Sequence, residues 1–117
     1  MTIHDLQQLC EKHPTVTQDI KWEKHLCFNV GGKMFLVTAP DNVPVSASIK
    51  VTDEDFELLP QREGIIPAPY MARYKWIHLD DINRLDKKEW EHYVKLAYEL
   101  IFAKLTAKTR KEIENGD

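Results

Sequence analysis

HLCFNVGGKMFLVT, residues 25–38, is the stretch that decides the fold class. Two runs rich in apolar residues flank Gly31 and Gly32, and paired glycines can adopt the positive φ angles of a two-residue turn, so the stretch predicts a β-hairpin. The turn sets the pairing, and the core-facing side would hold Leu26, Phe28, Val30, Phe35 and Val37. The opposite side is half apolar and would hold His25, Cys27, Asn29, Met34, Leu36 and Thr38.

Three further segments predict strands around this hairpin. Residues 17–22 (TQDIKW) form a candidate first strand, and residues 44–52 (PVSASIKVT) alternate apolar and polar side chains as a half-buried antiparallel strand does. Residues 73–79 (RYKWIHL) predict a last strand, with residues 61–72 as a proline-interrupted loop before it. In that last strand Arg73 and Lys75 would share one face with Ile77 and Leu79, opposite Tyr74, Trp76 and His78.

Helical signals stand at both ends and after the fourth strand. Residues 3–12 and 87–105 carry apolar stripes behind capping residues, residues 53–60 form a short acidic helix, and residues 112–117 are expected to fray. The predicted fold is a two-layer α+β domain over residues 1–117. An antiparallel sheet of about five strands would have the N- and C-terminal helices packed on one face. The other face would stay open, with Ser46, Ser48 and Lys50 on it.

The composition is that of a soluble domain. At 117 residues the chain is long enough for one domain with a core, and no apolar run approaches the ~20 residues that span a bilayer. The segment MTIHDLQQLC lacks the pattern of a signal peptide, and Cys10 and Cys27 show no disulfide or metal-site spacing, so we expect a cytoplasmic protein with no membrane contact.

No motif predicts catalysis, a cofactor or a metal. Gly31-Gly32-Lys33 lacks the frame of a phosphate-binding loop, the five histidines are scattered, and no serine or cysteine stands in a recognisable nucleophile motif. We therefore expect a protein that is not an enzyme and has neither cofactor nor metal.

The uneven distribution of charge along the chain is compatible with a local anion-binding surface. The net charge of −3 excludes a generally basic nucleic-acid binder, yet residues 61–117 hold 11 Lys and Arg against 10 Asp and Glu. The cations of residues 104–111 fit either the C-terminal end of a helix dipole or a phosphate-contacting patch. Arg73 and Lys75 could contact phosphate, with Tyr70 or Tyr74 stacked on a base. Alternatively, Trp76 and Ile77 pack in the fold while the two cations are solvated or pair with nearby acids.

Several stretches together resemble the MmcQ/YjbR family. They are DIKWEKHLCFNVGGKMFLV (19–37), SIKVTDEDFELL (48–59), REGIIPAPYMARYKWIHLDD (62–81) and YELIFAKLTAKTRKEI (98–113). The resemblance implies a frataxin-like (CyaY-like) fold and DNA binding by a double-wing mode, with no catalytic residues to carry over. Many members have Asn-Lys followed by His-Trp where this chain has Ala72-Arg73 and Lys75-Trp76.

Two functions follow as hypotheses. The first is modest, phosphate-dominated DNA binding through a set of cations and one tyrosine: Lys33, Lys50, Tyr70, Arg73, Lys75, Lys104, Lys108 and Arg110. The second is a protein-interaction module or homodimer that uses the open sheet face around Cys27, Met34 and Leu36.

Overall fold

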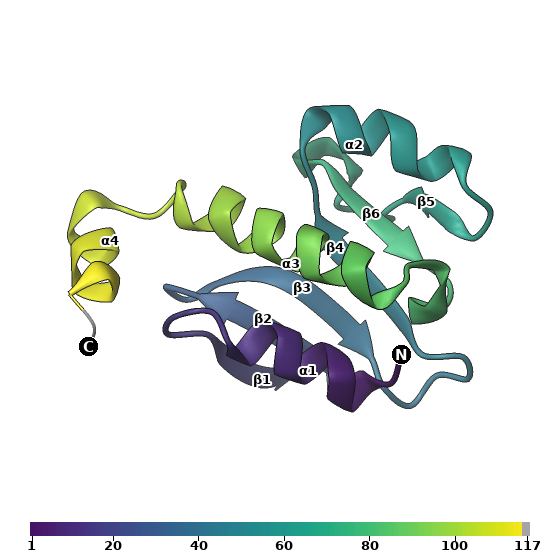
Figure 1. Ribbon diagram of the computed structural model, residues 1–117, viewed down its shortest axis with the longest axis horizontal. Helices are drawn as coiled ribbons and strands as arrows, with labels where there is room; N and C mark the ends of the chain where they lie inside the picture. The colour runs from purple at the N-terminus through teal and green to yellow at the C-terminus, as the bar shows by residue number, and fades with distance from the viewer. Residues whose placement is uncertain (116–117) are drawn as a thin grey trace.

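One antiparallel sheet of six strands forms the floor of the molecule in the computed structural model, which describes residues 1–115. The strands are β1 (Thr17–Lys21), β2 (His25–Val30), β3 (Lys33–Ala39), β4 (Ser46–Lys50), β5 (Ile65–Pro67) and β6 (Trp76–Leu79). Their order across the sheet is β1-β2-β3-β4-β6-β5, so β1 and β5 are the edges (Figure 1).

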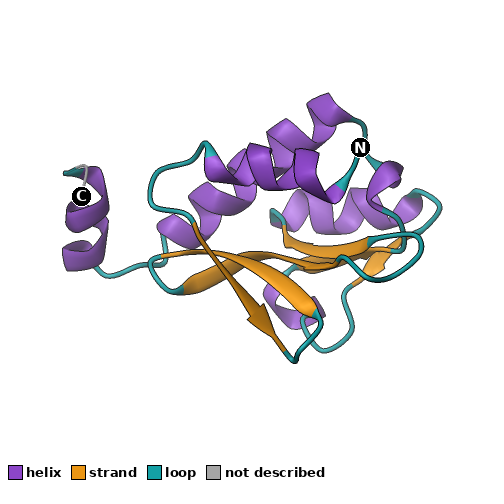
Figure 2. Ribbon diagram, turned by 90° about the horizontal axis from the view of Figure 1, so that it is seen from below, coloured by secondary structure: helices purple, strands orange, loops and turns teal. Residues whose placement is uncertain are grey.

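The long helices form a second layer on one side of this sheet (Figure 2). The helices are α1 (Ile3–Glu11), α2 (Asp53–Leu58), α3 (Lys87–Phe102) and α4 (Ala107–Glu114). Thr2 and Asp86 begin α1 and α3 with complete capping boxes, as the sequence predicted. The two-layer α+β class is confirmed, with six strands in place of about five.

The core lies between α1, α3 and the inner face of the sheet. Trp90 of α3 is fully buried, and its indole Nε1 donates a hydrogen bond of 2.7 Å to the carbonyl of Ile82. Around it pack fully buried side chains from several elements, among them Leu6, Phe28, Phe35, Leu36, Ile49, Ile77 and Leu79.

The β2–β3 hairpin has the predicted turn but a different register. Gly31 and Gly32 both have positive φ, whereas a bulge shifts the pairing so that Asn29 faces Met34 and Phe28 faces Leu36. Phe35 is the extra residue, and an extra residue reverses the alternation of every residue beyond it. Leu36 therefore lies in the core and Val37 on the outer face, so the predicted sides of these two residues were wrong.

The segment before the last strand also differs from the prediction. The expected loop contains the edge strand β5, and the expected strand over residues 73–79 begins only at Trp76. Ala72–Tyr74 form a 3₁₀ turn, and Lys75 ends it in the left-handed conformation with a φ of 64°. Arg73 and Lys75 therefore do not lie on a strand face, because the chain turns at Lys75 before the strand pairing of β6 begins.

The C-terminal part forms two helices where one was expected. The helix predicted to reach residue 105 ends at Phe102, and Thr106 caps α4 by accepting a hydrogen bond of 3.2 Å from the Thr109 amide. Fraying was predicted for residues 112–117, but residues 112–114 are helical, and residues 116–117 lie outside the described part.

Candidate functional site

Three of the predicted cationic positions come to one end of the sheet through strand pairing. β3 begins beside the end of β4, since the two strands are antiparallel with Leu36 opposite Ile49. β6 begins beside the same end, since Lys50 pairs with Trp76. One end of the sheet therefore holds three lysines: Lys33 at the start of β3, Lys50 at the end of β4, and Lys75 just before the start of β6.

The tip of the β2–β3 hairpin brings the C-terminal cations to this end. Gly31 lies so close to Leu105, which stands between α3 and α4, and to Thr109 of α4 that an added Cβ would stand 2.6 Å from Leu105 Cδ1 and 3.2 Å from Thr109 Cγ2. Lys104 precedes Leu105, and Lys108 precedes Thr109. Figure 1 places α4 and the hairpin turn at the same end of the molecule. We call this region the basic end: Lys33, Lys50, Lys75, Lys104, Lys108 and Arg110.

Lys50 is the member of the basic end that solvent does not reach. It is only 6% exposed, and its Nζ donates a hydrogen bond to the carbonyl oxygen of Tyr74. Burial lowers the pKa of Lys50, and the ammonium groups of Lys104 and Lys75 lower it further, partly offset by Asp53. The expectation of Lys50 on an open face was wrong, because the turn at Ala72–Tyr74 covers it.

The other cations differ in how freely they reach solvent. Lys33, Lys104 and Lys108 are exposed. Lys75 is half-buried with its Nζ 4.9 Å from the centre of the Phe56 ring of α2. Arg110 is half-buried, and its Nε has no hydrogen-bond partner among the described residues. The acidic first turn of α2 follows β4 at this same end and reduces the local positive charge.

The outer face of the sheet is partly covered. Residues 68–71 fold across it, and a second apolar cluster forms under them, separate from the main core: Cys27, Met34, Val37, Ala68, Met71 and Trp76. The backbone amide of Ala68 donates a hydrogen bond of 2.9 Å to the carbonyl of Trp76, which fixes this cover on the sheet. The open face predicted from the sequence is thus reduced to a groove.

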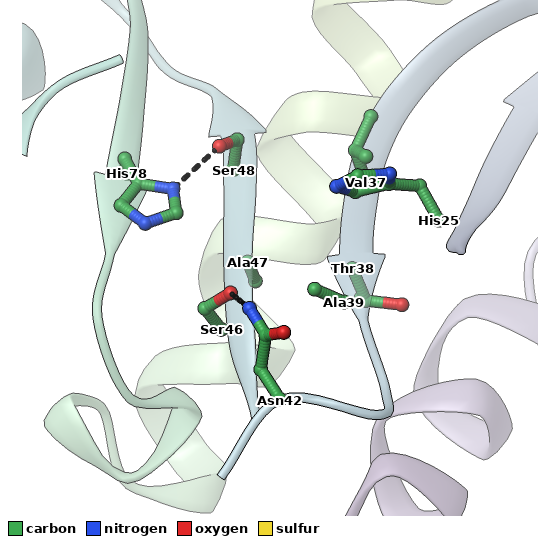
Figure 3. Close-up of a pocket in the computed structure, with 9 residues that line it drawn as sticks. All are labelled: His25, Val37, Thr38, Ala39, Asn42, Ser46, Ala47, Ser48 and His78. Atoms are coloured by element: carbon green, nitrogen blue, oxygen red, sulfur yellow. Dashed lines mark hydrogen bonds between the residues drawn. The ribbon is translucent and has the colours of Figure 1, made fainter. Parts of the chain in front are cut away.

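This outer groove has a volume of about 590 Å³ and a mostly apolar lining: Trp22, His25, Met34, Val37, Ser48, Pro69, Tyr70, Met71 and His78. It continues into a smaller cavity of about 170 Å³ that shares His25, Val37, Ser48 and His78 and also reaches Asn42 and Ser46 (Figure 3). Four interior strands, β2, β3, β4 and β6, supply the floor.

A small polar cluster lies in the floor of the outer groove. Ser48 Oγ and His78 Nδ1 are 2.9 Å apart across the paired strands β4 and β6. Burial lowers the pKa of His78, which favours the neutral ring, and its Nδ1 can then accept a hydrogen bond from the Ser48 hydroxyl. His25 reaches across β3 toward β4 in Figure 3, and its buried Nδ1 has no hydrogen-bond partner among the described residues.

Two exposed aromatic side chains stand at the rim of the outer groove. Trp22 comes from the β1–β2 turn and is 67% exposed, whereas Tyr70 comes from the β5–β6 connection and is 99% exposed. Arg73 follows three residues after Tyr70 and is also exposed, with its guanidinium carbon 4.9 Å from the centre of the Tyr74 ring. Tyr70 therefore belongs to the outer groove, and Arg73 stands in the following turn, Ala72–Tyr74, just before Lys75 of the basic end.

Sequence reasoning named Tyr70 as a site residue but missed Trp22, His25, Ser48 and His78. The outward alternation of Ser48 was visible in the sequence, but its partner lies 30 residues away on a strand whose position only the sheet order fixes. The one sequence signal for Trp22 is its place as an aromatic residue at the end of the predicted strand 17–22.

Within residues 1–115, no three His, Cys, Asp or Glu side chains are grouped so that they could hold a metal ion. None of the helices in that range has the length and apolar content needed to cross a membrane.

Comparisons with known proteins agree on the fold. A crystal structure of a Deinococcus radiodurans protein with a DUF419 domain has a TM-score of 0.86 at 24% identity, covering 97% of this chain and 88% of that one. A Pseudomonas syringae protein has a TM-score of 0.69 at 20% identity, covering 86% of this chain and 98% of that one. No curated protein matches the sequence. The YjbR family model matches residues 11–100, and this chain therefore belongs to the YjbR family.

Proposed function

We propose that the protein binds DNA, modestly and mainly through phosphate contacts at the basic end. The observation that carries the proposal is the meeting of cations from distant segments. Lys33 of the hairpin tip and Lys104 and Lys108 of the C-terminal region are all exposed, and Gly31, two residues before Lys33, closely approaches Leu105 and Thr109, the neighbours of Lys104 and Lys108 in the chain. Phosphate contacts depend on Lys and Arg side chains that reach solvent, and these three do.

Modest affinity follows from the charges around the basic end. The chain has a net charge of −3, and the acidic turn of α2 stands at the same end. Lys50 is excluded from contact by burial, so its role is to hold the turn at Tyr74. The proposed role is binding without a chemical step, with Ser48 and His78 acting as hydrogen-bonding groups and not as a nucleophile and its base.

Charge reversal tests the proposal. In anisotropy titrations of a labelled duplex at 50 mM salt, Lys104→Glu with Lys108→Glu should weaken binding by on the order of 100-fold, because each lost phosphate contact forfeits its counterion release. Lys87→Glu with Lys88→Glu is the matched control, since both lysines are exposed in the first turn of α3, away from the basic end. Equal losses in both pairs, or no binding by the unmodified protein, would contradict the proposal.

A further inference from the structure

The rim of the outer groove is built from strained backbone. Trp22 and Tyr70 have φ angles of 52° and 66°, in the left-handed region where residues with a Cβ are uncommon. Both carry large aromatic rings that are exposed instead of packed, although the same chain provides glycines at other left-handed positions. Residues with strained backbone angles that no packing of their own side chains offsets are found most often at ligand-binding and other functional sites.

The groove offers an aromatic surface from each side of its floor. Trp22 stands on the side of β1 and β2, and Tyr70 on the side of β5 and β6, with β3 and β4 between them. Trp22 is held against His25, whose ring centroid is 5.7 Å from its own in an edge-on arrangement. A flat ligand with an apolar face can stack on either ring.

The polar cluster in the floor suits the edge of such a ligand. His25 lines both the outer groove and the smaller cavity beside Ser48 and His78, so its imidazole ring borders the space that a ligand would enter. Ser48 and His78 present further donor and acceptor groups beside it (Figure 3). A stacking face combined with donors and acceptors along one edge describes a nucleobase.

Charges at the groove leave one route for the attached phosphates. Arg73 lies two residues beyond the groove-lining Met71 and is exposed. On the other side, Glu23 follows Trp22, and Asp19 is held by the Asn29 amide at 2.9 Å. The backbone of a bound strand would therefore run along the Arg73 side, away from Glu23 and Asp19.

We propose that the outer groove takes an unpaired base of single-stranded DNA, stacked on Trp22 or Tyr70 with its edge toward His25, Ser48 and His78. This inference rests on the proposed function and adds to it a preference for single strands over duplex. A peptide is the weaker occupant, because strand addition needs a free sheet edge and all four floor strands are paired on both sides.

Three probes of equal length test this inference: a single strand, its duplex and an abasic strand that keeps the phosphates without the bases. The unmodified protein should bind the single strand more tightly than either of the others at low salt. Trp22→Ala and Tyr70→Ala should each weaken single-strand binding by roughly 5- to 150-fold, the range of one lost base–aromatic stack, and leave the abasic strand unaffected. Leu58→Ala, at an exposed apolar position on α2, is the control and should change nothing.

The outcomes separate this inference from the proposed function. Equal binding of the single and abasic strands, or unchanged binding by Trp22→Ala and Tyr70→Ala, overturns the base site while phosphate binding at the basic end stands. Binding of none of the three probes overturns both. A dimer that dissociates in Trp22→Ala, with no preference for the single strand, would assign the groove to a second copy of the chain and likewise overturn the base site.

Discussion

Substituting Gly31 by alanine tests the contact that assembles the basic end. Gly31 has a φ of 57°, and a Cβ there would stand 2.6 and 2.8 Å from the two terminal carbons of Leu105. Leu105 is buried between α3 and α4, so it has little room to withdraw. Gly32 gives a matched control, because its φ is 81° and an added Cβ would meet nothing within 4 Å.

The magnitude follows from comparing the two sites. Both alanines carry the left-handed penalty of about 1–2 kcal/mol, so that cost cancels between them. Gly31→Ala adds the cost of overpacking against Leu105, about 1–3 kcal/mol. For a domain of 117 residues the unfolding entropy near the melting temperature is about 0.25 kcal/mol/K, so Gly31→Ala should melt about 4–12 °C below Gly32→Ala.

Thermal unfolding followed by circular dichroism measures this difference, and the same proteins should then be titrated with duplex DNA. Displacing the Leu105 segment moves Lys104 and Lys108 away from the hairpin, so Gly31→Ala should also bind more weakly than Gly32→Ala when both are folded. Equal melting temperatures would refute the packing of the hairpin tip against the segment between α3 and α4.

Three further results are expected. Lys50→Met should lower the free energy of unfolding by about 1–3 kcal/mol, because the Tyr74 carbonyl loses the donor that holds its turn, while DNA binding by the folded protein should stay within about twofold. A loss of binding like that of the Lys104 and Lys108 variant would show that Lys50 contacts DNA. Trp22→Gly should not lower the urea midpoint of unfolding, because glycine adopts the positive φ of this position without strain, yet it should weaken binding of single-stranded DNA. A clear loss of stability would mean that the indole has a structural role. Burial holds the pKa of His78 below its ordinary value of 6.5, so the unfolded state takes up the proton first and the free energy of unfolding should fall as the pH drops below about 6.5. His78→Asn should flatten that fall in urea titrations at pH 7.5, 6.5 and 5.5, and a pH profile equal to that of the unmodified protein would contradict this assignment.

The elements that the sequence predicted well are those with a local cause. Residues 44–52 alternate because one face of β4 is buried, and Ala47 and Ile49 point into the core as expected. The Gly31-Gly32 turn depends on two adjacent residues alone. The bulge was missed because Phe35 and Leu36 are both apolar, so the local pattern fits either register, and only the pairing with β4 fixes which side Leu36 takes.

The parts that could not be predicted depend on contacts between distant segments. The turn at Lys75 is held by tertiary hydrogen bonds, since the Lys75 carbonyl accepts from the Val51 amide at 2.9 Å. The burial of Lys50 follows from that turn. The pairing of Ser48 with His78 requires β6 to insert between β4 and β5, a sheet order for which the sequence has no local signal.

The salt dependence of duplex binding tests the central claim most directly. The slope of the logarithm of the binding constant against the logarithm of salt concentration counts phosphate contacts, at about −0.9 for each one. Lys104→Ala with Lys108→Ala should make this slope shallower by about 2, whereas Lys87→Ala with Lys88→Ala should leave it unchanged. The same slope in both variants, equal to that of the unmodified protein, would contradict phosphate binding at the basic end.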